Sequence, residues 1–277
     1  MKTIIRFLRY PGSKRRMLTF LSQYLPRAES IDGIYVEPFV GSAAVYFSVD
    51  PQKAILTDLN PDLIDLLCGI QSAPSLVWQI YSSFGATKQD YQYVRDQYKP
   101  FKLEEKAARI LFINRTCFKG MWRTNRYGEF NVGYGGQARR WVINETNLTE
   151  VSKTLRKAKI YCSDFEEVIY KLTSGDFLFI DPPYRPGEKE LLNEHYIGKT
   201  FRFPDHQRLG QALHWAKENG IHWAMTTSEH PAIVGLFKSN YLVRLPQGTG
   251  KFPGVIAQNS GEVLITSYPI AEGEFLC

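Results

Sequence analysis

Six short apolar runs of the chain each end at or beside a polar or acidic residue. They cover residues 33–39, 53–58, 159–163, 177–181, 222–227 and 241–245. Amphipathic stretches lie between several of them, which predicts alternating strands and helices and therefore a mostly parallel sheet with helices on both faces. Because functional groups of such sheets gather at the carboxyl ends of the strands, Glu37, Asp58, Asp164 and Asp181 are candidate site residues.

Two of the amphipathic stretches carry recognisable helix ends. Asn147 and Glu150 have the spacing of a capping box, which predicts a helix that begins at Asn147 and runs towards Lys157. A second helix is expected over residues 205–219, with Gly220 as the left-handed residue that follows its last turn.

The alternation of strands and helices lapses between about residues 62 and 144. Helical patterns cover residues 63–70, 75–84, 91–98 and 104–114, and a loop rich in Gly, Arg and aromatic residues follows them. We therefore predict two domains: a sheet domain formed by residues 1–60 and 145–277, and an inserted helical domain formed by residues 61–144.

The composition is that of a soluble globular protein, with 44% hydrophobic and 22% charged residues among 277. No apolar run approaches the roughly 20 residues of a membrane span. Arginines interrupt the apolar N-terminal stretch, so we expect a cytoplasmic chain without a secretory signal. The four cysteines are scattered, and four of the five histidines lie eight residues apart, so we expect no metal site.

Positive charge is concentrated in two parts of the chain. The formal net charge is +6, yet residues 1–28 hold seven Lys or Arg and no acidic residue. Residues 115–159 hold ten Lys or Arg against three Glu. Segregated positive charge of this kind is typical of proteins that bind a polyanion such as nucleic acid, although two solvated basic faces would have the same composition.

The run Asp181-Pro182-Pro183-Tyr184 ends the apolar stretch 177–180 in a chemically unusual way. The prolines fix the backbone and remove two N–H donors, which leaves the Pro182 carbonyl as a rigid acceptor beside the Asp181 carboxylate. Two acceptors and the flat face of Tyr184 suit an aromatic ring that bears an exocyclic amino group. An ordinary strand-terminating turn is the alternative, and it would not need these three groups together.

A second candidate region follows the first strand. Gly41 permits a ligand to approach the backbone, and Glu37 and Phe39 precede it in the same turn. Asp58 ends the next strand, seventeen residues after Gly41, where a carboxylate can bind the two hydroxyls of a ribose. A helix cap is the alternative role for Asp58.

Eight motifs, in this order along the chain, resemble those of the Dam-like family of N6-adenine DNA methyltransferases, which use S-adenosylmethionine. They are RYPGSK (9–14), VEPFVGSA (36–43), TDLN (57–60), FINR (112–115), GEFNVGYG (128–135), SDF (163–165), DPPY (181–184) and GEVLITSY (261–268). The resemblance implies a methyltransferase sheet, Rossmann-like and mostly parallel, whose last strand is antiparallel. It also implies a helical target-recognition domain, which would bind DNA, and a catalytic domain that binds the cofactor.

The resemblance also implies site residues. Asp181, Pro182 and Tyr184 would be catalytic, and the transfer to a flipped adenine would be direct and in line. The family usually has Trp at position 10 and Gly at positions 13 and 43, where this chain has Tyr10, Ser13 and Ala43. The residues expected to bind the cofactor are Tyr10, Lys14, Glu37, Phe39, Gly41, Asp58, Asp164, Phe165 and Asp181.

The stretch 114–140 combines arginines with aromatic residues, as a surface that reads duplex DNA would. A solvated hairpin with aromatic side chains packed on its own domain is the alternative. Members that recognise GATC commonly have Leu and Pro where this chain has Met121 and Gly133, so the target sequence is left open. The residues expected to contact DNA are Arg115, Lys119, Arg123, Asn125, Arg139 and Arg140, the last two through phosphates.

Other functions remain as alternatives at this point. Methyltransferases of RNA or of protein glutamine use related acceptor motifs, and a catalytically inactive DNA-binding regulator could share the fold. The recognition insertion and the two basic stretches favour double-stranded DNA as the partner. We expect a monomeric enzyme of a bacterium or phage, paired with a cognate restriction endonuclease if it serves restriction-modification.

Overall fold

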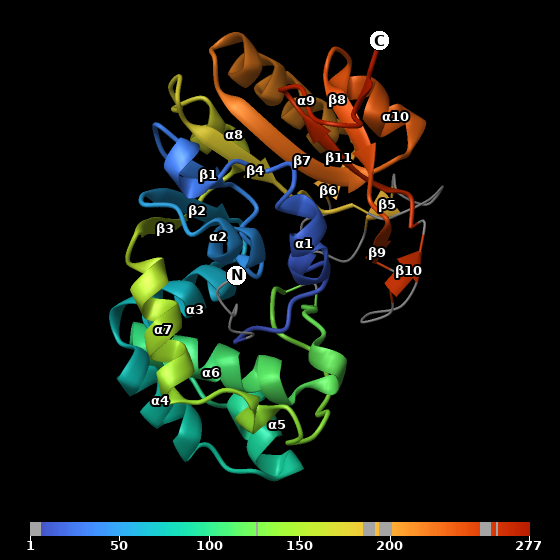
Figure 1. Ribbon diagram of the computed structural model, residues 1–277. Helices are drawn as coiled ribbons and strands as arrows, with labels where there is room; N and C mark the ends of the chain where they lie inside the picture. Colours follow the sequence, from blue (N-terminus) through green and yellow to red (C-terminus); the bar gives the residue numbers. More distant parts are fainter. Residues whose placement is uncertain (1–6, 126, 185–191, 194–200, 250–255, 259) are drawn as a thin grey trace.

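The computed structural model describes residues 7–125, 127–184, 192–193, 201–249, 256–258 and 260–277. Figure 1 shows a twisted sheet in the upper half of the molecule and a group of helices below it. The described residues form one sheet of eight strands, in the order β12-β8-β11-β7-β4-β1-β2-β3. Its strands are β1 (Tyr35–Glu37), β2 (Ala54–Asp58), β3 (Ala158–Cys162), β4 (Phe177–Ile180), β7 (His222–Ser228), β8 (Tyr241–Arg244), β11 (Glu262–Thr266) and β12 (Glu274–Phe275).

The pairing of these strands confirms the predicted fold class. β3, β2, β1, β4 and β7 are parallel neighbours, and β11 lies antiparallel between β7 and β8. All six apolar runs of the sequence form strands of this sheet, with ends that shift by at most two residues. Two small antiparallel pairs lie outside it, β5 (Leu192–Asn193) with β6 (Phe201–Arg202) and β9 (Gln247–Thr249) with β10 (Ile256–Gln258).

Helices cover both faces of the sheet. One face packs α8 (Phe165–Ile169), α9 (Phe203–Glu218) and α10 (Pro231–Val234), and the other packs α1 (Leu18–Leu21) and α2 (Ala44–Val49). Gly220 follows α9 with φ of 73°, which confirms its predicted place after the helix. The short 3-10 helices are η1 (Lys14–Met17), η2 (Ala28–Ser30), η3 (Phe118–Gly120), η4 (Arg140–Val142) and η5 (Gly235–Phe237).

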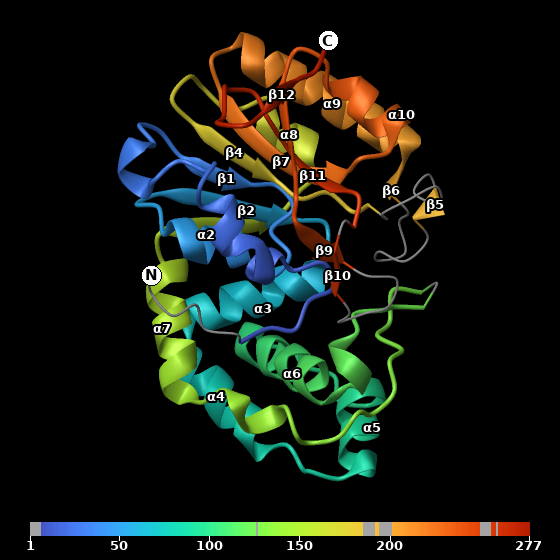
Figure 2. The same ribbon diagram turned by 45° about the vertical axis from the view of Figure 1, so that its right-hand side comes forward.

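In the described residues, five α-helices lie between β2 and β3 in the chain, and they form the lower half of the molecule (Figure 2). One predicted helix start was wrong: Asn144, rather than Asn147, is the N-cap of α7 (Glu145–Leu155), and Asn144 and Asn147 cap each other reciprocally. Asn147 is therefore the third residue of the helix, where its amide replaces the usual Glu. The helices are α3 (Pro61–Ser72), α4 (Pro74–Ser83), α5 (Lys88–Asp96), α6 (Leu103–Thr116) and α7 (Glu145–Leu155).

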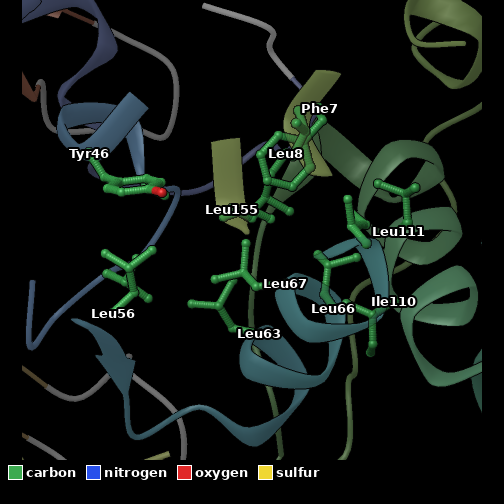
Figure 3. Close-up of a cluster of buried hydrophobic side chains, with 14 of the residues drawn as sticks. Phe7, Leu8, Tyr46, Leu56, Leu63, Leu66, Leu67, Ile110, Leu111 and Leu155 are labelled. Carbon is green, nitrogen blue, oxygen red and sulfur yellow. The ribbon is translucent and has the colours of Figure 1, made fainter. Parts of the chain in front are cut away.

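The hydrophobic core runs without a break from the sheet into these helices. Figure 3 shows leucines of α3 between the sheet side of the cluster, with Leu56 and Tyr46, and the α6 side, with Ile110 and Leu111. All of these side chains belong to one buried cluster. The predicted limits at residues 61 and 144 therefore mark a change of secondary structure, and the packing crosses them. The division into two domains stays a prediction.

Polar contacts also join the two halves. The Gln71 amide donates to the carbonyls of Leu155 and Ala158, at 2.6 and 2.9 Å. Asn114, in the last turn of α6, exchanges two hydrogen bonds with the backbone of Arg9, at 2.9 and 2.6 Å. The N-terminal segment that precedes η1 is thus held by a helix from the middle of the chain.

Within the described residues, no single helix has the length and hydropathy of a membrane span; α3 and α4 reach them only as a pair bent by 116°.

Candidate functional site

A cavity of about 910 Å³ opens at the carboxyl ends of β1, β2 and β4. Its walls come from six parts of the chain: the N-terminal segment before and within η1, the turn after β1, the end of β2, the segment after β3, the turn after β4, and residues 201–208 of β6 and α9. Parallel strands bring these ends to one edge of the sheet, as expected. The cavity brings together every residue predicted to be catalytic or to bind the cofactor: Tyr10, Lys14, Glu37, Phe39, Gly41, Asp58, Asp164, Phe165, Asp181, Pro182 and Tyr184.

Asp181 directly follows β4 and is held by two side chains. Lys14 Nζ lies 2.7 Å from Asp181 Oδ1, and the Thr226 hydroxyl donates to the same oxygen at 2.7 Å. Burial raises the pKa of Asp181, and the charge and hydrogen bond of Lys14 lower it. Lys14 is itself buried in η1, so the cation and the carboxylate form a pair at the wall of the cavity.

Tyr184 is fixed at its hydroxyl end. Its Oη donates a hydrogen bond to Glu262 Oε2, at 2.8 Å, and Lys14 Nζ lies 5.0 Å from the centroid of its ring. The aromatic face, the Pro182 residue and the Asp181 carboxylate all line the same cavity. A flat aromatic amine that entered here would meet an acceptor and a stacking surface together.

Glu37 ends β1 and is almost completely buried. Burial raises its pKa to about 8, although the Tyr35 hydroxyl donates to Glu37 Oε1 at 2.5 Å and favours the charged form. Burial therefore favours the protonated form of this carboxyl. A cationic group in the cavity would favour its ionised form.

Asp58 ends β2 and organises the turn after β1. It accepts hydrogen bonds from the backbone N–H groups of Gly41, at 3.2 Å, and Asn60, at 3.0 Å. Burial raises its pKa to about 6, and these backbone bonds oppose the rise. The N-cap of α3 is Asn60, so the structure gives that role to a neighbour of Asp58.

Gly41 lies close to the aromatic ring of Tyr10. Its φ is 46°, and a Cβ atom at this position would lie 3.3 Å from the Tyr10 ring. Tyr10 in turn packs on Trp122, with ring centroids 5.4 Å apart. One wall of the cavity is thereby connected to the segment that follows α6.

Aromatic and charged side chains of the turn after β1, of α8 and of α9 line another part of the cavity. Phe39 and Phe165 stack with centroids 5.4 Å apart, and the Arg208 guanidinium lies 4.9 Å from the centroid of Phe165. Asp164 caps α8 by accepting from Glu166 N at 3.0 Å, and it pairs with Arg208 at 2.9 Å. Planar apolar faces beside a carboxylate are suited to a purine ring with an amino group.

Two of the residues predicted to contact DNA have a structural role. Arg115 and Arg140 are each 1% exposed, so neither side chain reaches a phosphate from this conformation. Arg115 Nε donates to the Arg139 carbonyl at 2.8 Å, and Arg140 donates to the carbonyls of Tyr81 and Gly85 at 3.1 and 3.0 Å. Backbone carbonyls accept hydrogen bonds from both guanidinium groups and so hold this loop on the helices, and a DNA contact through either residue stays a prediction.

The other predicted DNA contacts lie at the surface or close to it. Lys119, Arg123 and Arg139 are exposed. Arg123 Nε donates to Asn131 at 2.8 Å, which leaves the charge of the guanidinium at the surface. Asn125 is half-buried, and its Oδ1 accepts from the backbone N–H groups of Tyr127 and Glu129, at 2.9 and 3.0 Å, so it shapes the turn of this loop.

Sequence reasoning missed three polar residues at the site. Thr226 and Glu262 contact Asp181 and Tyr184, and Arg208 lines the cavity at its aromatic end. A signal for Thr226 was present, because the buried strand β7 ends in the polar run Thr-Thr-Ser. Glu262 had a weaker signal, an acid directly before three apolar residues of a buried strand. Among the described residues, no group of three or more His, Cys, Asp or Glu side chains is placed to hold a metal ion.

Comparison with known proteins gives a consistent result. The family model of the D12 class N6 adenine-specific DNA methyltransferases matches residues 10–249. A Type II methyltransferase of Methanocaldococcus jannaschii is 30% identical over 259 residues, which cover 86% of this chain and 89% of the relative. The DNA adenine methylase of Vibrio cholerae is 28% identical over 227 residues, 80% of each chain. The DNA N-6-adenine-methyltransferase of Escherichia phage P1 is 33% identical, and the match covers 83% of this chain but 30% of the phage protein.

Proposed function

Because the chain belongs to the D12 class of N6 adenine-specific DNA methyltransferases, we propose that it transfers a methyl group from S-adenosylmethionine to the N6 atom of an adenine displaced from duplex DNA. The observation that carries the proposal is the grouping of Asp181, Pro182 and Tyr184 on one wall of a cavity whose other walls suit a nucleoside. The RNA and protein-glutamine alternatives lose support, since the family acts on DNA adenine.

The residues of the cavity fit S-adenosylmethionine. Asp58 would hold the ribose hydroxyls, and Phe39, Asp164 and Phe165 would hold the adenine. Glu37, with a pKa raised to about 8, would lose its proton when the cationic part of the cofactor lies near it. When bound, this cofactor supplies an electrophilic methyl group on a positively charged sulfur. Tyr10, Lys14 and Gly41 would complete the pocket.

The chain's own groups orient the nucleophile. Asp181 and the Pro182 carbonyl would each accept a hydrogen bond from one N–H of the target amino group. These bonds make the nitrogen lone pair available for attack. Tyr184 would stack on the base. Because Lys14 and Thr226 already orient the carboxylate, little reorganisation is required when the adenine arrives. Attack is then direct, with no covalent bond between the enzyme and the base.

An adenine inside a duplex cannot reach this wall, so the base must leave the stack. Lys119, Arg123 and Arg139 are exposed cations of the predicted recognition segment and would contact phosphates. Asn125 would act from the same loop, either on a base edge or by holding the turn. We place the activity in the cytoplasm, on DNA, with a monomer as the acting species.

The decisive experiment measures tritium transfer from labelled S-adenosylmethionine into duplex DNA, RNA and protein. We expect label in DNA alone and its loss in Asp181→Ala, with DNA affinity largely kept. Asp65→Ala, on the surface of α3, is the matched control. Near-normal turnover by Asp181→Ala would reject the catalytic assignment, and DNA binding without transfer by the unaltered protein would favour an inactive regulator.

The names of two relatives support a role in restriction-modification. The proteins of Methanocaldococcus jannaschii and Lactococcus lactis that match most of this chain are both named Type II methyltransferases. We therefore include a cognate restriction endonuclease among the proposed partners. Sequencing of methylated adenines in DNA from expressing cells would give the target site, and DNA so modified should resist the endonuclease. Methylation spread over unrelated sequences would contradict this role.

A further inference from the structure

Two polar side chains of neighbouring strands are hydrogen-bonded to the two ends of the turn formed by residues 181–184. Thr226, on β7, donates its hydroxyl to Asp181 Oδ1 at 2.7 Å. Glu262, on β11, accepts from the Tyr184 hydroxyl at 2.8 Å. The turn that carries the acceptor and the stacking ring is therefore connected to the antiparallel β7–β11 pair as well as to β4.

The register of the two strands places these side chains on one face of the sheet. Ser228 pairs with Glu262, and Thr226 pairs with Leu264. Side chains two residues apart on a strand share a face, so Thr226 and Glu262 are diagonal neighbours, roughly 7–8 Å apart at Cα. Leu264 packs in the same buried cluster as Phe179, two residues before Asp181, which assigns that face to the catalytic turn.

Both side chains are out of reach of bulk water. Thr226 is 0% exposed and Glu262 is 2% exposed. A buried carboxylate or hydroxyl is costly unless it is hydrogen-bonded, and an apolar residue would pack at either strand position without this cost. The Glu262 carboxylate also lies near enough to Asp181 to raise the pKa of that group, while the hydrogen bond of Thr226 lowers it. The hydrogen bonds to Asp181 and Tyr184 explain why a threonine and a glutamate occupy these buried positions.

We propose that Thr226 and Glu262 are positioning residues of the methylation reaction: Thr226 orients the Asp181 carboxylate, and Glu262 fixes the ring of Tyr184. Each acts through another residue and need not touch the adenine. This inference rests on the proposed function. An aspartate and a tyrosine side chain can each rotate about two bonds, and displacement of a reacting group by 1 Å can cost about 100-fold in rate.

The test of Glu262 is a double-mutant cycle with Tyr184. Tyr184→Phe keeps the stacking ring and removes the hydroxyl, and we expect kcat to fall about tenfold with little change in KM for DNA. Glu262→Leu should cause a similar fall, and Glu262→Gln, which keeps an acceptor, should recover most of it. The combination of Tyr184→Phe with Glu262→Leu should lose no more than either change alone. If the fold-loss in kcat of the double variant instead equals the product of the two single losses, the proposal for Glu262 is overturned.

The test of Thr226 uses a pH profile. Thr226→Val keeps the shape but removes the donor, so the pKa of Asp181 rises and the acid limb of the kcat profile moves to higher pH. Lys14, Glu37 and Glu262 also face Asp181 and are unchanged in this variant. Thr226→Ser should restore the limb. An unshifted limb in Thr226→Val would overturn the role of Thr226.

Controls separate this inference from the function on which it rests. Thr266→Val removes an equally buried hydroxyl of β11, which is bonded to the Tyr268 carbonyl outside the cavity, and should leave kcat unchanged. Glu274→Leu, at the exposed edge strand β12, is the control for Glu262. If Asp181→Ala retains turnover, the proposed function fails. If Asp181→Ala is inactive while Tyr184→Phe, Glu262→Leu and Thr226→Val keep their kcat, only the positioning roles fail.

Discussion

The carboxyl edge of the sheet and the segment 114–140 both carry charged residues that the sequence predicts to be functional. Those at the sheet edge line a cavity, whereas two of those in the segment 114–140 are buried in the protein. At the sheet edge, Asp181 and Lys14 pair with each other beside an open cavity. In the segment 114–140, Arg115 and Arg140 are buried, and backbone carbonyls accept their hydrogen bonds. Strand ends of a parallel sheet have a fixed direction towards the site. The last turn of α6 and the start of η4 instead direct Arg115 and Arg140 into the interior.

The first prediction tests the buried arginine. Arg140→Met should lower the free energy of unfolding by about 3 kcal/mol or more, because it leaves several buried carbonyls without donors. It also removes the guanidinium that lies 4.5 Å from the ring of Trp141. Thermal unfolding followed by circular dichroism measures the change. Arg139→Met, one residue earlier and exposed, is the control. An equal melting temperature for the two variants would contradict the stabilising role of Arg140.

The second prediction tests the charge pair of the cavity. Lys14→Met should lower kcat about 100-fold at neutral pH, because it removes the cation that stabilises the Asp181 carboxylate. Burial already raises the pKa of Asp181, and without Lys14 it rises further, so the acid limb of the pH profile should move to higher pH. Methylation rates between pH 6 and 9 check both effects. Lys53→Met, an exposed residue directly before β2, should have the profile of the unaltered protein.

The third prediction concerns the exposed cations of the loop. Lys119→Met and Arg139→Met should each weaken DNA binding several-fold and reduce the slope of log affinity against log salt by about 1, as the loss of one phosphate contact does. The melting temperature should stay the same. Fluorescence anisotropy of labelled duplex DNA at several salt concentrations gives the slope. A slope equal to that of the unaltered protein would remove these residues from the interface.

The smallest effect is expected at Ala43, where the related enzymes usually have Gly. Ala43 has φ of 54°, in the left-handed region that glycine adopts without strain. Ala43→Gly should therefore be neutral or stabilise the protein by up to about 1 kcal/mol. Ala44→Gly, one residue later in α2, should destabilise it by about 1 kcal/mol. Chemical unfolding of the two variants would test this, and destabilisation by both would contradict the strain at Ala43.

The sequence predicted the parallel strands well because most of them are buried apolar runs with a polar end; β3, at the edge of the sheet, is largely exposed. The acids of the cavity followed from the same rule, since Glu37 and Asp58 end strands and Asp181 directly follows one. The pairing of Glu262 with Tyr184 could not be predicted, because it depends on the register of β11 against β7. The burial of Arg140 was equally inaccessible, because the acceptors are carbonyls that any residue supplies.

The continuous packing of α3 against both the sheet and α6 has an evolutionary consequence. The helices between β2 and β3 form an enlarged crossover of a parallel sheet, and they are not an appendage joined by a linker. The proposed recognition loop after α6 could therefore be exchanged by itself, whereas transplantation of the whole helical segment between relatives would have to carry the matching faces of α3 and α7. Chimeras of two relatives that are joined within α3, whose two faces pack on the sheet and on α6, should have a lower melting temperature than either parent.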